Sequence, residues 1–117
     1  MFVRYVQVSA ELAPLVTVRG VIEYGRDPAK EAENVRQHSV AFDDAIVALR
    51  DPFAVEWFDE GHSADEPRFM KVGRDIRGRF LTVVTSDGGH GPRIISARRA
   101  SKRERNAYES QRPLGPA

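Results

Sequence analysis

The sequence contains no cysteine among its 117 residues. This absence excludes disulfide frameworks, cysteine-ligated zinc, iron–sulfur clusters and thiol nucleophiles. Uninterrupted apolar runs are only a few residues long, and the opening MFVRY lacks the basic and long apolar regions of a secretory signal. We therefore expect a soluble cytoplasmic protein that has no membrane partner and folds as one compact domain.

Histidine is also scarce, because only His38, His62 and His90 occur, and none of them shows an HxH, HxxxH or HExxH spacing. Metal sites usually need such ligand patterns, so we expect no metal and no cofactor. His62 lies in an acidic loop. Loops carry functional residues but more often only connect elements, so both interpretations of His62 remain open.

The net charge of +1 conceals an asymmetry along the chain. Residues 1–60 carry 6 basic and 11 acidic side chains, whereas residues 61–117 carry 12 basic and 6 acidic ones. Between Arg68 and Arg105 there are 11 basic residues and 3 acidic residues. Such a segment either contacts a polyanion or pairs with acidic groups elsewhere in the chain.

The first part of the chain predicts strands and then a helix. Two stretches rich in valine, isoleucine and aromatic residues predict strands, at residues 1–8 and 15–24. Asp27 and Pro28 are a helix-start signal, because aspartate caps well and proline suits the first turn. We expect the helix to continue to residue 38, with Ala32 and Val35 facing inward.

A second helix is predicted by apolar residues spaced i, i+3, i+4 and i+7, namely Phe42, Ala45, Ile46 and Leu49. Asp51 and Pro52 end it. Its N-cap position is occupied by Ala41, a poor cap that costs about 1 kcal/mol relative to serine.

From residue 53 onward the apolar period changes to two. Four short β-rich runs alternate with turn clusters, at residues 53–58, 68–72, 79–85 and 93–98. Short loops between them predict an antiparallel meander. Ser101 and Glu104 form a capping-box pattern that begins a final helix, which we expect to reach about Glu109. The expected fold class is α+β: a small antiparallel sheet with two N-terminal helices and one C-terminal helix.

Arginine is the strongest chemical signal. Arg68, Arg93 and Arg98 begin or end neighbouring predicted strands, which concentrates guanidinium groups along one rim of the sheet. Guanidinium groups bind phosphate in bidentate fashion and stay charged at any working pH. RNA brings its own nucleophile, the 2′-hydroxyl, so a protein need only orient phosphate, stabilise charge and move protons. RNA binding or cleavage is the function that these residues favour; pairing of the arginines with the acidic first sixty residues is the alternative.

Short motifs in a fixed order carry a family resemblance. They are DPAK at 27–30, Asn34, QH at 37–38, FDDA at 42–45, DP at 51–52, EPR at 66–68, GR at 78–79, VV at 83–84, and RIISARRASKRER at 93–105 followed by Tyr108. Over about residues 22–109 the sequence resembles the BrnT toxin family, which is similar to the RelE-like toxins of type II toxin–antitoxin systems. Ser39 departs from the family, which usually has glycine there, and we expect it to strain a tight helix–helix turn.

The resemblance implies a RelE-like toxin domain over residues 21–110. Residues 1–20 are then an N-terminal extension, for which an extra strand is one interpretation, and residues 111–117 are a flexible tail. The resemblance also implies RNA cleavage and a cognate BrnA-like antitoxin with a ribbon-helix-helix part, so that DNA is contacted indirectly through the antitoxin. The alternative function is a non-enzymatic module that binds an antitoxin-like repressor in transcriptional control.

The resemblance further suggests which residues act. Arg68, Arg79 and Arg98 are expected to bind phosphate and the transition state, and His62, Glu66 or Tyr108 to move protons. Four further basic residues are expected to contact the RNA: Arg93, Arg74, Arg77 and Lys71.

Overall fold

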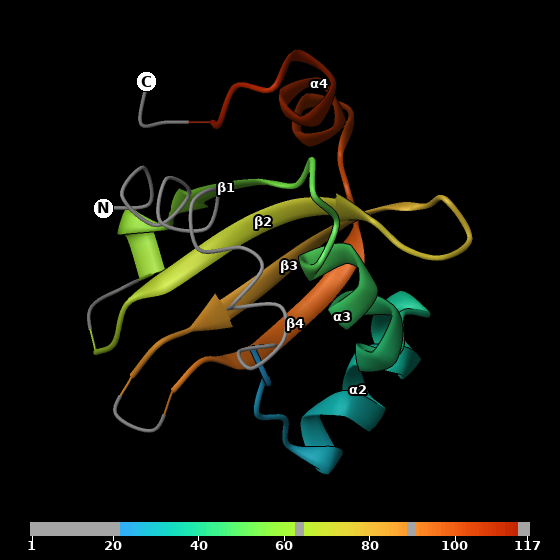
Figure 1. The fold of residues 1–117 in the computed structure, drawn as a ribbon. Coiled ribbons are helices and arrows are strands. Elements are labelled where there is room, and N and C mark those ends of the chain that lie inside the picture. The colour runs from blue at the N-terminus through green and yellow to red at the C-terminus, as the bar shows by residue number, and fades with distance from the viewer. Residues whose placement is uncertain (1–21, 63–64, 89–90, 115–117) are drawn as a thin grey trace.

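The computed structural model describes residues 22–62, 65–88 and 91–114, and Figure 1 shows how they are arranged. In chain order their elements are α2 (Pro28–His38), α3 (Phe42–Leu49), β1 (Val55–Phe58), the short 3₁₀ helix η1 (Glu60–His62), β2 (Arg68–Arg74), β3 (Phe80–Ser86), β4 (Arg93–Arg99) and α4 (Lys102–Ser110). The predicted α+β class, with two helices before the sheet and one after it, is confirmed. No helix within these ranges is long and apolar enough to cross a membrane.

Several predictions for the chain ends fall outside the described residues. These are the strand at 1–8, the extension at 1–20, residues 15–21 of the second strand, and residues 115–117 of the tail. Residues 22–24 are described and form no strand, so the end of the second predicted strand is wrong. Instead, Gly25 forms an isolated parallel bridge with Arg93 of β4.

The four strands form one antiparallel sheet in the order β1-β2-β3-β4, as the short loops predict. Strand β2 extends two residues further than expected, through Gly73, which had been assigned to a turn. A Cβ atom at Gly73 would lie only 2.0 Å from the carbonyl oxygen of Ala48 in α3. Glycine at this position therefore allows strand β2 to pack closely against helix α3, and it does not form a turn.

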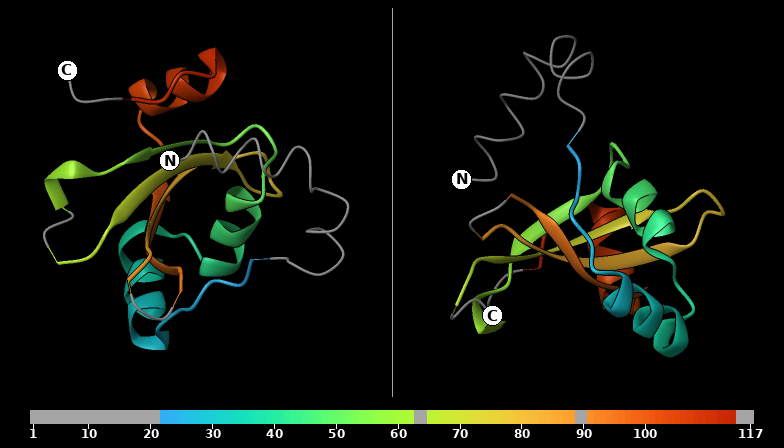
Figure 2. Two further views of the ribbon diagram at one scale, coloured as in Figure 1. Left: turned by 60° about the vertical axis from the view of Figure 1, so that its left-hand side comes forward. Right: turned by 90° about the horizontal axis from the view of Figure 1, so that it is seen from below.

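Helices α2 and α3 lie on one face of the sheet and α4 lies on the other (Figure 2). The alternation along β3 explains this division. Leu81 and Val83 are fully buried in the core cluster that includes Phe42 of α3, whereas the Thr82 hydroxyl between them donates to Glu104 of α4 at 2.9 Å. Successive side chains of a strand point to opposite faces, so β3 carries a helix contact on each side.

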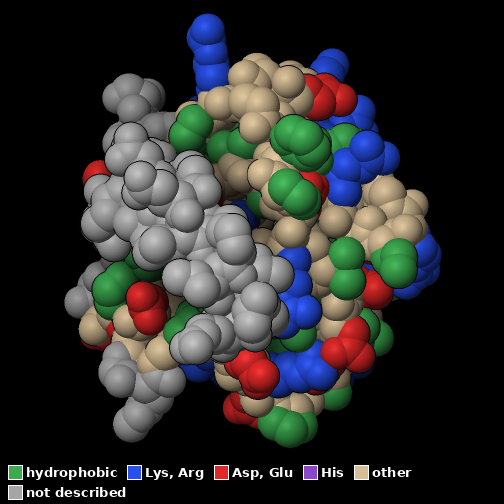
Figure 3. All heavy atoms as spheres, viewed as in Figure 1, with side chains coloured by type: hydrophobic (Ala, Val, Ile, Leu, Met, Phe, Trp, Pro, Cys, Tyr) green, Lys and Arg blue, Asp and Glu red, His purple; other side chains and the backbone are tan. Residues whose placement is uncertain are grey.

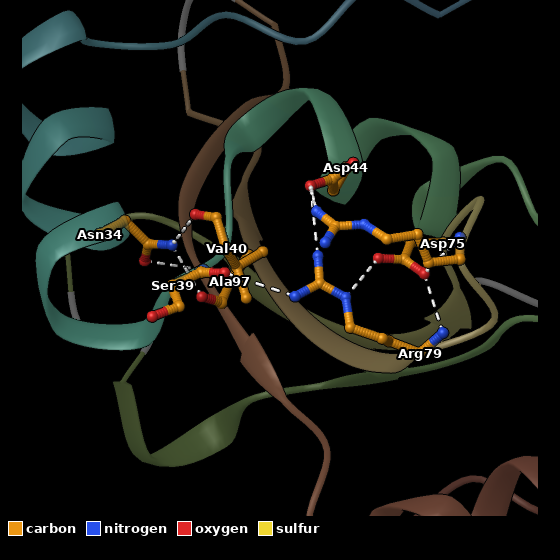
Figure 4. A network of polar contacts seen from close by, with 8 residues as sticks. Asn34, Ser39, Val40, Asp44, Asp75, Arg79 and Ala97 are labelled. Carbon is orange, nitrogen blue, oxygen red and sulfur yellow. Dashed lines mark hydrogen bonds and ion pairs between the residues drawn. The ribbon is translucent and has the colours of Figure 1, made fainter.

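The buried face of α2 differs from the prediction. Ala32 and Val35 are exposed, and Asn34 is buried instead. The Asn34 amide donates to the carbonyl oxygens of Val40 and Ala97, each at 2.8 Å, and its Oδ1 accepts from the Ala97 N–H at 3.0 Å (Figure 4). The helix is thus attached to β4 by a buried amide with its hydrogen bonds satisfied, and apolar contact plays the smaller part.

The turn between α2 and α3 is held by Ser39, which adopts a left-handed conformation with φ 58° and ψ 35°. Asp27 caps the start of α2 by accepting from the Ala29 N–H at 2.8 Å, as predicted. Ala41 provides no side-chain cap for α3, also as predicted. The apolar residues Phe42, Ala45 and Leu49 of α3 are buried.

Candidate functional site

The face of the sheet that carries α4, called the α4 face here, is ordered in rows across the strands. In the first row Arg68 is paired with Ser86, and Ser86 with Arg93. Helix α4 covers the opposite end of this face, where Tyr108 packs edge-on against Phe80 with ring centroids 5.2 Å apart. The row of two arginines around a serine therefore lies at the end of the sheet far from α4.

Glu66 lies over this first row, and its carboxylate joins the row's side chains. Arg93 Nη2 lies 2.5 Å from Glu66 Oε1, and the Ser86 hydroxyl donates to the same oxygen. The Ser86 hydrogen bond, followed by Arg93 and the charge of Arg68, lowers the pKa of Glu66 from its usual value. This end of the sheet thus combines an ionised carboxylate with two guanidinium groups.

Gly88 completes the Glu66 site from the β3–β4 loop. A Cβ atom at Gly88 would lie 2.5 Å from Glu66 Oε2 and 2.9 Å from Glu66 Cβ. Both distances are too short for real atoms, so the missing side chain is what allows Glu66 to lie over Ser86.

Arg98 and Glu104 form a second cluster in the middle of the same face. Arg98 donates from Nη1 and Nη2 to the two oxygens of Glu104, each at 2.8 Å, and the Ser101 N–H donates to Glu104 Oε1 at 2.8 Å. Burial alone would raise the pKa of Glu104, but the hydrogen bonds from Arg98, Ser101 and Thr82 outweigh it and lower that pKa to about 2. The predicted capping box is confirmed, and its glutamate also anchors Arg98.

Tyr108 and Asp51 form a third cluster beneath α4. The Tyr108 hydroxyl donates to Asp51 Oδ2 at 2.7 Å, and the Arg74 N–H donates to the same oxygen at 2.9 Å. Burial and the hydrogen bond to Asp51 raise the pKa of Tyr108 to about 12. The phenol is therefore protonated across the neutral pH range, which makes it a poor proton acceptor there.

Arg79 belongs to a fourth cluster, on the α3 side of the sheet (Figure 4). Its Nε donates to Asp75 Oδ2 at 2.7 Å and its Nη2 to Asp44 Oδ2 at 3.2 Å. Arg77 pairs with the same oxygen of Asp44, also at 3.2 Å. Only 16% of the Arg79 side chain is exposed, so its guanidinium group already holds the β2–β3 hairpin onto α3.

The structure thus separates the predicted site residues into groups. Glu66, Arg68 and Arg93 come together, while Arg98, Tyr108 and Arg74 lie elsewhere on the α4 face. Arg79 and Arg77 contact α3, and Lys71 lies on the face of the sheet that carries α2 and α3, where it is paired with Glu56 of β1.

His62 ends η1, and no side-chain geometry is described for it. No group of three His, Asp or Glu side chains that could hold a metal ion occurs within the described ranges.

Ser86, Gly88 and Asp51 contribute to these clusters, although the sequence did not indicate them as site residues. The sequence pattern places Ser86 and Gly88 in the turn between the predicted strands at residues 79–85 and 93–98. The signal that could have found Ser86 is the hairpin register, because pairing Arg68 with residue 86 places its hydroxyl beside Glu66.

Comparison with known proteins adds the family. No individually curated protein matches the sequence significantly. Residues 27–104, two thirds of the chain, match the family described as the ribonuclease toxin BrnT of type II toxin–antitoxin systems. This match covers the Glu66, Arg93, Arg98 and Arg79 clusters. The chain belongs to the BrnT family of ribonuclease toxins.

Proposed function

We propose that the chain is the toxin of a type II toxin–antitoxin system and cleaves RNA at the end of the α4 face, without a metal ion, through the RNA's own 2′-hydroxyl. The observation that carries this proposal is the joining of Glu66 to Arg93 and Ser86 in the row that Arg68 completes. A carboxylate beside two guanidinium groups supplies the two things that this reaction needs, a proton acceptor and stabilisation of phosphate charge.

In the proposed step, the 2′-oxygen attacks the adjacent phosphorus atom while the bond from phosphorus to the 5′-oxygen breaks. Glu66 accepts the proton of the 2′-hydroxyl, and His62, four residues before it, donates a proton to the leaving 5′-oxygen. The products are a 2′,3′-cyclic phosphate and a 5′-hydroxyl. Arg68 and Arg93 stabilise the negative charge that develops on the phosphate.

Binding of the RNA phosphate also makes Glu66 a stronger general base. In the free protein, hydrogen bonds from Ser86 and Arg93 lower the pKa of Glu66. A phosphate that takes over the guanidinium of Arg93 removes one of these stabilising contacts, so the pKa of Glu66 rises and the carboxylate becomes a stronger proton acceptor. Substrate binding and base activation are thereby coupled at one arginine.

The other predicted arginines have different proposed roles. Arg98 contributes a further phosphate contact on the same face, whereas Arg74 lies at the far end of β2, next to Asp51, and is not part of the proposed cleavage site. Arg79 and Arg77 pair with Asp44 and Asp75 on the α3 side, which supports a role in holding the fold over direct contact with the reacting phosphate.

The test uses the purified full chain and an end-labelled single-stranded RNA, with a chelator present. We expect Glu66→Gln to lower the cleavage rate by about 100-fold or more, because it removes a general base. Glu60→Gln is the matched control, since Glu60 is exposed in η1 nearby. Fragments of the wild-type reaction should end in a cyclic phosphate. Cleavage that the chelator abolishes, or that Glu66→Gln leaves intact, would refute the mechanism.

One observation favours the alternative function, a non-enzymatic module that binds an antitoxin-like repressor. Arg79, Arg93 and Arg98 are all ion-paired with carboxylates in the structure. If those pairs persist in solution, the protein tightens a repressor on DNA and shows no salt-sensitive RNA binding.

The proposed partners and location follow from the family. We propose that the toxin acts in the cytoplasm and is bound by a BrnA-like antitoxin whose ribbon-helix-helix part contacts DNA. Co-expression with the product of the adjacent gene and purification through a tag on the toxin tests this. Recovery of the toxin without that product would count against it.

A further inference from the structure

A pocket of about 400 Å³ opens between the end of α3, the turn after it, the end of β2 and α4. It is lined by Val47, Arg50, Asp51, Pro52, Arg74 and Tyr108. Val47 retains 39% of its surface exposed, an unusual level for an apolar side chain on a helix that otherwise faces the core. The pocket lies at the opposite end of β2 from Glu66 and Arg68, about 20 Å away at the usual rise per strand residue.

The Asp51 carboxylate in this pocket already accepts hydrogen bonds from within the protein. Asp51 Oδ2 accepts from the Tyr108 hydroxyl and the Arg74 N–H, and Asp51 Oδ1 accepts from the Phe53 N–H at 2.9 Å. Although burial would raise it, these hydrogen bonds lower the pKa of Asp51, which is therefore ionised and fully engaged within the protein. Asp51 shapes the pocket floor and is not offered to a ligand.

Guanidinium groups surround the pocket. Arg50 and Arg74 line it, and Arg74 and Arg105 both lie over the ring of Phe80, at 5.0 and 5.4 Å from its centroid. None of these three arginines forms an ion pair with a carboxylate of the described residues. Cations of this kind can pair with carboxylates of a partner while their stems pack on apolar surface.

Exposed apolar side chains extend the surface beyond the pocket. Phe53, next to Pro52 in the lining, is 63% exposed, and Ile76, two residues after Arg74, is 79% exposed. On the face seen in Figure 3, hydrophobic side chains lie directly beside Lys and Arg side chains around α4 and the β2–β3 hairpin. Apolar side chains rimmed by charge mark protein-binding surfaces, and arginine is enriched among the residues that dominate their affinity.

We propose that this pocket and its rim bind a segment of the antitoxin. One aliphatic or aromatic side chain of that segment fills the space beside Val47 and Pro52, and flanking carboxylates pair with Arg50 and Arg74. The proposal rests on the antitoxin partner that the family implies, and it is independent of the cleavage chemistry. The exposed aliphatic surface of Val47, beside Pro52, favours a protein side chain in the pocket, and an RNA strand is the alternative occupant that the test below distinguishes.

The proposal separates antitoxin binding from catalysis. The pocket and the first row of the α4 face lie at opposite ends of β2, so substitutions in one need not change the other. Val47 and Arg50 both lie outside the proposed catalytic cluster, and both are exposed. They are therefore suitable positions for a test that leaves the chemistry of the site alone.

The test measures the affinity of the full-length toxin for the product of its adjacent antitoxin gene, by calorimetry at about 0.1 M and 0.5 M salt. Val47→Gln removes the apolar wall, and Arg50→Glu reverses a charge at the rim. We expect each to weaken binding by about tenfold or more, with the Arg50→Glu effect shrinking at the higher salt concentration. Arg103→Glu, on the exposed side of α4, is the matched control and should leave the affinity within about twofold of wild type.

Two measurements of folding distinguish a loss of antitoxin binding from a loss of the fold. Far-UV circular dichroism and thermal unfolding show whether each variant folds, and Val47→Gln, a neutral change at an exposed position, remains informative if Arg50→Glu does not fold. Unchanged antitoxin affinity in folded variants overturns the proposal. Retained antitoxin affinity with loss of RNA binding also overturns it and assigns the surface to RNA. If wild-type protein fails to cleave RNA, the catalytic proposal fails while the affinity measurement still decides this one.

Discussion

Gly88 shows how one missing side chain controls the proposed site. Its position beside Glu66 leaves no room for a Cβ atom, and its backbone conformation is not one that only glycine adopts easily. Gly88→Ala should therefore keep the fold and displace the carboxylate from Ser86 and Arg93. We expect the RNA cleavage rate to fall about tenfold or more with the melting temperature nearly unchanged.

The matched control for this substitution is Gly61→Ala, because a Cβ atom there would meet, among the described residues, only Asp59 Oδ1, at 3.8 Å. Equal cleavage by Gly88→Ala and wild type would mean that the observed position of Glu66 does not matter for catalysis.

Ser39 illustrates backbone strain at a single residue. A non-glycine residue in the left-handed region costs roughly 1–2 kcal/mol, and part of the gain from glycine is lost to the greater freedom of the unfolded chain. We expect Ser39→Gly to raise the free energy of unfolding by about 1 kcal/mol, measured by urea denaturation.

The other non-glycine residue with a left-handed conformation among those described, Gln111, provides a contrast to Ser39. Its Nε2 donates to the carbonyl oxygens of Phe53 and Tyr108, so Gln111→Gly loses two hydrogen bonds when it relieves the strain. A gain at position 111 as large as that at position 39 would contradict strain as the explanation.

At the scale of elements, most of what the sequence predicts is local. Helix starts, the capping box at Ser101, the poor cap at Ala41 and the order of the strands follow from short-range patterns, and the structure confirms them. The burial of Asn34 and the packing role of Gly73 could not be predicted, because they depend on β4 and α3, which lie far from these residues in sequence. Pattern reasoning has no access to such distant contacts.

The site shows the same division between local and distant information. The resemblance suggests arginines and Glu66 as site residues, and the meander explains why Arg68 and Arg93 share a row. Which carboxylate each arginine binds could not be predicted, because that depends on side-chain geometry. Glu104, predicted only as a capping residue, proves to be the partner of Arg98.

Helix α4 depends on that same glutamate, which predicts a pH-dependent stability. The carboxyl of Glu104 has a pKa of about 2 in the folded protein and an ordinary value of 4.5. A lowered folded-state pKa stabilises the fold above pH 4.5, and this contribution is lost as the pH falls toward 2. Its size at neutral pH is roughly 3 kcal/mol, from the free energy of a shift of this size.

Unfolding by urea at several pH values tests this dependence. Glu104→Gln should be less stable than wild type at pH 7, and the difference should narrow steadily below about pH 5. Glu109→Gln, at an exposed position of the same helix, should show no such change. A stability difference that stays constant down to pH 3 would contradict the assignment of the stabilisation to the Glu104 carboxylate.

At the scale of the whole molecule, the basic second half of the chain compensates part of its charge internally. Among the described residues, Arg79–Asp75, Arg93–Glu66 and Arg98–Glu104 are ion pairs within this half. The alternative that the sequence left open, pairing with the acidic first sixty residues, holds for Arg79 and Arg77, which contact Asp44. The pairs of Arg93 and Arg98 hold their guanidinium groups in place on the α4 face, where we propose that a phosphate exchanges with the carboxylate.

That exchange predicts how RNA binding responds to salt. If Glu66 is the general base, we expect the Glu66→Gln variant to bind RNA with little cleavage, so that its affinity can be measured directly by fluorescence anisotropy. Each phosphate contact to single-stranded nucleic acid contributes about 0.7 to the slope of log affinity against log salt concentration. Contacts from Arg68, Arg93 and Arg98 give an expected slope of about −2, and adding Arg68→Ala should reduce its magnitude by about 0.7.

The control adds Arg36→Ala to the Glu66→Gln variant instead. It should leave the slope unchanged, because Arg36 is exposed on α2 and pairs with Glu33. A slope near zero would mean that the arginines of the α4 face make no phosphate contacts, which is the behaviour expected of a repressor-binding module and not of a ribonuclease.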